Sequence, residues 1–93
     1  MAADETTLRV IYSGRVQGVG FRWNAREIAR RFPVVGYVCN LPDGTVELVV
    51  RGAPDRVREY LDAVARRFRN HMTGSDIQPI VLAEELESFD IRH

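Results

Sequence analysis

The spacing of apolar residues changes along this sequence between a period of two and a period of three to four. In residues 7–13 the side chains of Leu8, Val10 and Tyr12 recur at every second position and form one apolar face, which predicts a β-strand. From Phe21 to Phe32 the apolar residues recur at helical spacing, and Pro33 then excludes a further helical turn. Each segment has one apolar face, so the chain is restricted to folds that bury one side of a sheet against helices.

Apolar spacing and turn residues also predict the elements from residue 34 to the C-terminus. An Asp-Gly pair favours the positive backbone angles of a tight hairpin, and Pro followed by Asp is typical of a helix start. In chain order these signals predict strands at 34–40 and 45–51 around Asp43-Gly44, a helix from Pro54 to Phe68, a polar loop at 69–75, an edge strand marked by Ile77, Pro79, Ile80 and Leu82, and a short strand at Phe89 and Ile91.

The predicted order is β-α-β-β-α-β with one short strand added at the C-terminus. Two helices with one apolar stripe each can be buried together on one face of a mostly antiparallel sheet. The expected fold class is therefore α+β, a ferredoxin-like β-α-β-β-α-β sandwich. The 93 residues suffice for one domain, which we expect at 7–93 after an N-terminal tail at 1–6.

The charge balance argues against partners that need a strong electrostatic field. The formal net charge is zero, so neither nucleic acid nor an anionic membrane is an expected partner. There is no lysine, which excludes the P-loops and the Schiff-base chemistry that depend on one. Cys39 is the only cysteine, and the sequence has neither an apolar leader nor a membrane-length apolar run. We therefore expect a cytoplasmic protein.

The stretch from Ser13 to Arg22 carries three glycines between the first strand and the first helix. Glycines allow a tight backbone curve, and the following helix start supplies free N–H donors, so the loop is suited to hold a phosphoryl group. The guanidinium of Arg22, in the first helical turn, can bind the same anion. The alternatives are a merely tight turn for the loop, and a turn-forming role for Asn40 at the end of the next strand.

Two blocks of this sequence resemble the signatures of the acylphosphatase family. The first is GRVQGVGFR at 14–22, and the second is GYVCNLPDGTVE at 36–47. The likeness continues weakly through the second helix and returns with FDIR at 89–92. The resemblance implies a ferredoxin-like fold, in agreement with the periodicity, and 7–93 would then be an acylphosphatase-like domain.

The resemblance also implies a role for each matching residue. It assigns phosphate binding to Arg22 and orientation of the attacking water to Asn40, which would be the two catalytic residues. It implies a phosphate cradle of backbone amides formed by Gln17, Gly18, Val19, Gly20, Phe21 and Arg22. The sequence departs from the family pattern at Asn24, Ala25, Pro33 and Cys39, and over 69–88, where the final hairpin is shortened.

The activity implied by the resemblance is hydrolysis of carboxyl-phosphate anhydrides by in-line attack of water, with no metal and no cofactor. A carboxylate leaves readily, so this reaction needs positioning and charge stabilisation rather than a general acid. The expected partners are a small acyl phosphate and inorganic phosphate, as product and inhibitor, and the expected state is a monomer.

Three alternatives to this function differ in class. A weakly active or inactive phosphate-binding module is the main one. An RNA-binding sheet is less favoured, because the third strand has no exposed aromatics. A domain of a larger carbamoyl-transfer assembly, similar to those in hydrogenase maturation proteins, is disfavoured by the length of 93 residues. A metal pair of His71 and His93 is also disfavoured, because one lies in the polar loop and the other is the last residue.

Overall fold

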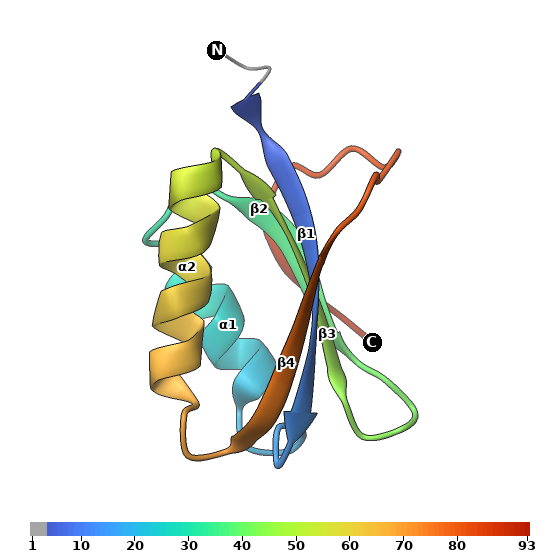
Figure 1. Ribbon diagram of the computed structural model, residues 1–93. Helices are drawn as coiled ribbons and strands as arrows, with labels where there is room; N and C mark the ends of the chain where they lie inside the picture. Colours follow the sequence, from blue (N-terminus) through green and yellow to red (C-terminus); the bar gives the residue numbers. More distant parts are fainter. Residues whose placement is uncertain (1–3) are drawn as a thin grey trace.

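The computed structural model describes residues 4–93 (Figure 1). Its regular elements are β1 (Thr6–Gly14), α1 (Phe21–Ala29), β2 (Val35–Asn40), β3 (Val46–Gly52), α2 (Pro54–Arg67), β4 (Met72–Pro79) and β5 (Phe89–Arg92). Of the predicted tail at 1–6, the first three residues lie outside the described part, and β1 already begins at Thr6. Within residues 4–93, neither helix combines the length and the apolar character needed to cross a membrane.

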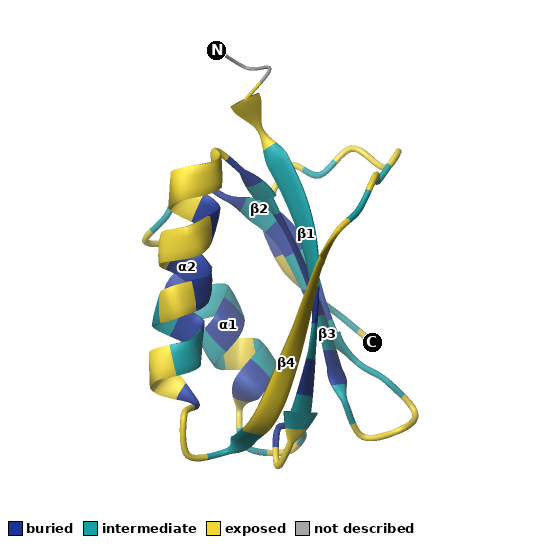
Figure 2. Ribbon diagram, viewed as in Figure 1, coloured by how far each residue is buried: buried dark blue, intermediate teal, exposed yellow. Residues whose placement is uncertain are grey.

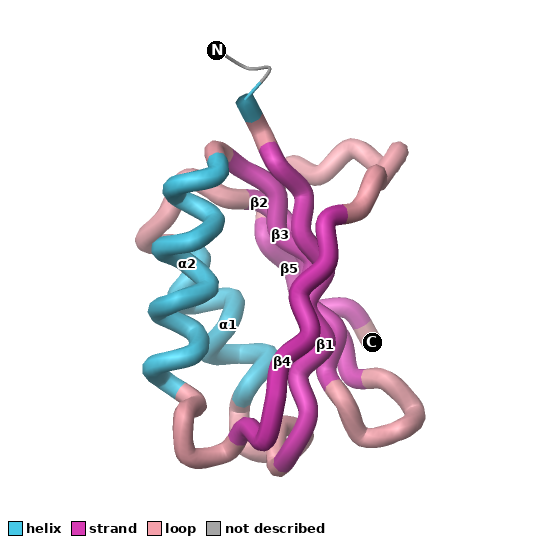
Figure 3. The backbone as a smooth tube through the Cα atoms, viewed as in Figure 1, coloured by secondary structure: helices cyan, strands magenta, loops and turns pink. Residues whose placement is uncertain are grey.

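The five strands form one sheet in the order β4-β1-β3-β2-β5. Neighbouring strands are antiparallel except β2 and β5, which run parallel. Both helices cover the same face of this sheet, as Figure 1 and the tube in Figure 3 show. This arrangement confirms the ferredoxin-like α+β sandwich, including the short strand added at the C-terminus.

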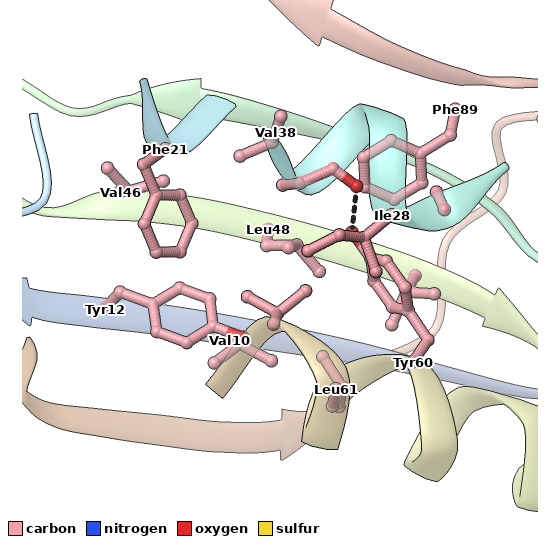
Figure 4. Packing of buried hydrophobic residues seen from close by; sticks show 14 of the residues in the cluster. Val10, Tyr12, Phe21, Ile28, Val38, Val46, Leu48, Tyr60, Leu61 and Phe89 are labelled. Atoms are coloured by element: carbon pink, nitrogen blue, oxygen red, sulfur yellow. Dashed lines mark hydrogen bonds between the residues drawn. The ribbon is translucent and has the colours of Figure 1, made fainter. Parts of the chain in front are cut away.

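The core lies between the helices and the sheet, where the apolar faces of the predicted elements meet (Figure 2). The hydroxyl of Tyr60 in α2 donates to the carbonyl of Ala25 in α1 at 2.8 Å and so joins the helices inside the core (Figure 4). Phe21, the first residue of α1, packs against Tyr12 and Phe68 with ring centroids 4.9 and 4.4 Å away. The start of α1 is therefore fixed to the core through a buried aromatic side chain.

The fourth strand differs from the prediction. β4 includes most of the stretch 69–75 that was predicted to be a loop, whereas Ile80 and Leu82 lie beyond its end. Nearly all β4 side chains are exposed, and the strand is held by antiparallel backbone pairing with β1. Backbone hydrogen bonds do not depend on an apolar pattern, so periodicity placed the strand too late. Pro79 does lie on an edge strand, at its end rather than at its start.

The first helix and the end of the chain also differ from expectation. α1 ends at Ala29, and a tighter turn follows in which the amide of Phe32 donates to the carbonyl of Ala29 at 3.1 Å. The expectation of a shortened final hairpin is wrong, because β4 and β5 lie at opposite edges of the sheet. The segment between them is held by Arg51, which donates to the carbonyls of Leu82 and Glu84 at 2.9 and 3.2 Å.

Candidate active site

The loop between β1 and α1 curves sharply because its glycines adopt left-handed backbone angles. The φ angle is +78° at Gly18 and +77° at Gly20. A Cβ at Gly18 would meet nothing within 4 Å, so glycine is favoured there by conformation and not by lack of space. Gly20 is the N-cap of α1 and has no side chain to cover the first helical amides. Those N–H groups are therefore available to an anion.

The side chain of Gln17 ties this loop to the hairpin between β2 and β3. Its Nε2 donates to the carbonyl of Leu41 at 2.8 Å and to the carbonyl of Thr45 at 2.9 Å. At the other end of the loop, the amide of Arg15 donates to the carbonyl of His71 at 2.8 Å. The loop is thus held from both sides before any ligand arrives.

We expect Gln17→Met to lower the free energy of unfolding by about 1 to 2 kcal/mol, because the two hydrogen bonds from Nε2 are lost. The carbonyls of Leu41 and Thr45 keep the hydrogen bonds that they accept from the amides of Gly44 and Leu41. Urea unfolding followed by circular dichroism measures this loss. Gln78→Met, on the exposed strand β4, is the matched control and should change stability by less than about 0.5 kcal/mol. Equal stabilities for the two variants would show that Gln17 is not a tether.

Arg22 extends from the first turn of α1 beside this loop. Its neighbour Phe21 is 1% exposed, whereas Arg22 itself is half-buried. Nη1 of Arg22 donates to Nδ1 of His93 at 3.2 Å. A guanidinium can only donate hydrogen bonds, so Nδ1 must accept, and the imidazole is in the tautomer protonated on Nε2. The remaining guanidinium N–H groups can bind an anion.

Asn40 is the last residue of β2, at the carboxyl end of the parallel pair β2–β5. The register pairs Cys39 with Arg92, so Asn40 and His93 are the next residues along the two neighbouring strands. Side chains alternate along a strand, so Asn40 faces the same side of the sheet as buried Val38, toward the helices. The carboxyl ends of β2 and β5 therefore meet the N-terminal turn of α1.

Arg22 and Asn40 line one hollow of about 180 Å³. Its lining residues are Val16, Gly18, Gly20, Phe21, Arg22, Trp23, Asn40, Ile91 and His93. The structure thus brings together most of the site residues predicted from the sequence. Gln17 and Val19 are not in the wall: the Gln17 side chain reaches the hairpin, and Val19 packs against the core.

The comparison with known proteins agrees with this architecture. The acylphosphatase family model matches residues 8–91. The chain belongs to the acylphosphatase family. An acylphosphatase of Caldivirga maquilingensis is 41% identical over 88 residues, which cover 92% of this chain and 93% of that protein. An acylphosphatase of Thermococcus kodakarensis is 64% identical over 48 residues, which span only 52% of this chain and 53% of that protein.

The fold comparison leads to the same family. The crystal structure of acylphosphatase from Bacillus subtilis matches with a TM-score of 0.81 and 29% sequence identity. The match covers 94% of this chain and 98% of the Bacillus subtilis protein. The two-helix, five-strand arrangement is therefore that of an acylphosphatase over nearly its whole length.

Two residues that depart from the acylphosphatase pattern have local partners in this structure. Nδ2 of Asn24 donates to the carbonyl of Gly20 at 2.8 Å, which adds a tie at the helix start. The thiol of Cys39 donates to Oε1 of Glu47 at 3.4 Å. Burial, and then this hydrogen bond, raises the pKa of the Cys39 thiol. The thiol therefore stays protonated at neutral pH and is a poor nucleophile.

Four lining residues of the candidate site, Val16, Trp23, Ile91 and His93, are not among the catalytic and phosphate-binding residues predicted from the sequence. Val16 directly precedes the predicted cradle and is fully buried. Trp23 had a local signal, since it follows Arg22 directly. Ile91 and His93 had none, because only the parallel pairing of β5 with β2 brings them to the hollow. His71, by contrast, packs edge-on against Phe68 at 6.0 Å. In the part of the chain that is described, no three His, Cys, Asp or Glu side chains are grouped as metal ligands.

Proposed function

We propose that this protein hydrolyses acyl phosphates to a carboxylate and inorganic phosphate. The observation that carries the proposal is the meeting of Arg22 and Asn40 in one hollow beside a glycine loop and a helix N-terminus. Membership of the acylphosphatase family supports the same reaction. This chemistry needs a cationic hydrogen-bond donor for the phosphoryl oxygens, a side-chain amide that binds the water, and backbone N–H groups without a partner.

In this proposal the phosphoryl oxygens are held by the Arg22 guanidinium and by the backbone amides from Gln17 to Arg22. Phosphoryl transfer usually passes through a loose transition state with negative charge on the equatorial oxygens. Donors that are already in place stabilise this charge without having to reorganise during the reaction. The left-handed glycines and the Gln17 tether are what keep these donors in place.

The side-chain amide of Asn40 binds the attacking water and aligns it with the phosphorus atom. The water oxygen forms a new bond to phosphorus while the bond from phosphorus to the acyl oxygen breaks. The electron pair of that bond leaves with the carboxylate, which needs no proton. Nδ1 of His93 is occupied by Arg22, so a phosphate oxygen accepts the proton of the water.

The test is hydrolysis of benzoyl phosphate, followed by the loss of its ultraviolet absorbance, with and without excess chelator. We expect turnover that the chelator does not change, because the proposed donors are all protein groups. A folded protein that shows no turnover would contradict the proposal. Phosphate binding without turnover, measured by calorimetry, would then favour the phosphate-binding module.

We also infer that inorganic phosphate is a competitive inhibitor, because product and substrate present the same oxygens to Arg22 and the loop. In the same proposal the protein acts as a cytoplasmic monomer without nucleic-acid or membrane partners. Sedimentation at the assay concentration tests the monomer, and initial rates at several phosphate concentrations test the competition.

His93→Leu is expected to raise the inhibition constant of phosphate about 3- to 10-fold, because Arg22 loses the acceptor that orients its guanidinium. His93→Asn is the matched control, since its side-chain oxygen can replace Nδ1 as the acceptor, and it should restore most of the affinity. If the leucine and asparagine variants gave the same inhibition constant, His93 would not position Arg22.

A further inference from the structure

The hollow of the candidate site has walls of two kinds. One part is polar, with Arg22, Asn40 and the glycine loop, and these groups suit the phosphoryl half of a substrate. The other part is apolar and includes Trp23 and Ile91. An apolar wall contributes nothing to binding a phosphate ion, so the proposed phosphoryl chemistry gives neither side chain a function. Ile91 also packs against the core, whereas Trp23 is exposed.

Trp23 is unusual among the apolar side chains of this protein because it is 55% exposed. The other large apolar side chains exposed within residues 4–93 are Ile77 and Val81, and neither lines this hollow. Within residues 4–93, the indole of Trp23 belongs to none of the aromatic pairs and donates no hydrogen bond to another side chain or to the backbone. A large, flat and unpartnered ring therefore stands at the rim of the site.

The position of the ring relative to Arg22 is set by the helix. The two residues are consecutive in the first turn of α1, whose start is fixed by buried Phe21. A phosphoryl group bound by Arg22 is covalently linked to its acyl group, so the acyl group must leave the polar part of the hollow within a bond or two. Ile91, from β5, supplies a second apolar surface in the same hollow.

We propose that Trp23 and Ile91 form an acyl-group subsite that favours aromatic and other flat apolar acyl phosphates over acetyl phosphate. This inference rests on the proposed function, since it assigns the second half of the same substrate. Stacking of an aromatic acyl group on the indole removes apolar surface of both from water and adds the favourable contact of two π-systems. An acetyl group is too small to make this contact.

The first experiment compares kcat/KM for benzoyl phosphate and for acetyl phosphate. Trp23→Ala is expected to lower kcat/KM for benzoyl phosphate about 10-fold and to change that for acetyl phosphate less than about twofold. Trp23→Phe, which keeps a flat ring, should restore most of the benzoyl activity. Ile77→Ala removes another exposed apolar side chain, outside the hollow, and should leave both values unchanged. An equal loss for both substrates in Trp23→Ala would overturn the proposal, because it would indicate a disturbed Arg22.

The second experiment does not depend on turnover. Trp23 is the only tryptophan, so its fluorescence reports on this subsite alone. We expect benzoylphosphonate, whose P–C bond is not hydrolysed, to change the emission more than acetylphosphonate or inorganic phosphate at saturation. Calorimetry should show that benzoylphosphonate binds the wild-type protein about 10-fold more tightly than acetylphosphonate does. The two phosphonates should bind Trp23→Ala with equal affinity. Equal affinities in the unchanged protein would refute the subsite. If neither acyl phosphate were hydrolysed but the phosphonates were still discriminated, the proposed function would fail and the subsite would stand.

Discussion

Arg22→Ala is expected to lower kcat/KM for benzoyl phosphate by about 10³-fold or more, with a large rise in the inhibition constant of phosphate. The reason is that Arg22 is the one arginine among the described residues that line the hollow, and the chain has no lysine. Its guanidinium can place two parallel N–H groups on the phosphoryl oxygens, and nothing else in the wall replaces that charge. Steady-state kinetics with phosphate as inhibitor measures both effects.

The matched control for this prediction is Arg31→Ala. Arg31 is exposed beyond the end of α1 and lines a different groove, between the two helices. Its removal changes the net charge by the same amount and should leave kcat/KM within about twofold of the unchanged protein, since exposed charges far from a site are screened. If phosphate bound as tightly to Arg22→Ala as to Arg31→Ala, the role assigned to Arg22 would be wrong.

Asn40→Ala is expected to reduce kcat about 10²- to 10³-fold and to change the inhibition constant of phosphate less than about threefold. Asn40 is assigned to the attacking water and not to the phosphoryl oxygens. Its loss should therefore affect the transition state more than the ground state, which appears as a fall in kcat rather than a rise in KM. Measuring both kcat and the inhibition constant of phosphate separates this role from that of Arg22, because loss of Arg22 should impair both turnover and phosphate binding.

Asn70→Ala is the control for Asn40→Ala, since Asn70 is exposed in the turn after α2. Thermal unfolding of both variants shows whether the fold is kept. A rise in the phosphate inhibition constant of Asn40→Ala that matched its loss of kcat would place Asn40 among the phosphate ligands instead.

Local features of the site were predictable because they depend on neighbouring residues. The positive φ angles at Gly18 and Gly20, the helix start at Phe21 and the strand end at Asn40 all agree with the sequence signals. Glycine is the residue that adopts left-handed angles at little cost, and an amphipathic stripe indicates which face of a helix is buried. Such signals are complete within a few residues.

The strand β4 shows where this reasoning stops. Its side chains from Thr73 onward are exposed, so burial imposes no apolar alternation on them. It is a strand because its backbone pairs with β1, and backbone groups are the same in every residue type. Periodicity therefore located the apolar Ile77 but not the bounds of the element.

By itself, the sequence determined the order of elements, the one-sided apolar faces, the shape of the glycine loop and the family. Whether Arg22 and Asn40 meet, and which residues join them, was decided only by the tertiary structure. The parallel pairing of β5 with β2 brings His93 beside Asn40 and within 3.2 Å of Arg22, although 71 positions separate His93 from Arg22 in the chain. That pairing depends on how all five strands assemble beneath the two helices, and no local sequence pattern at the end of the chain predicts it.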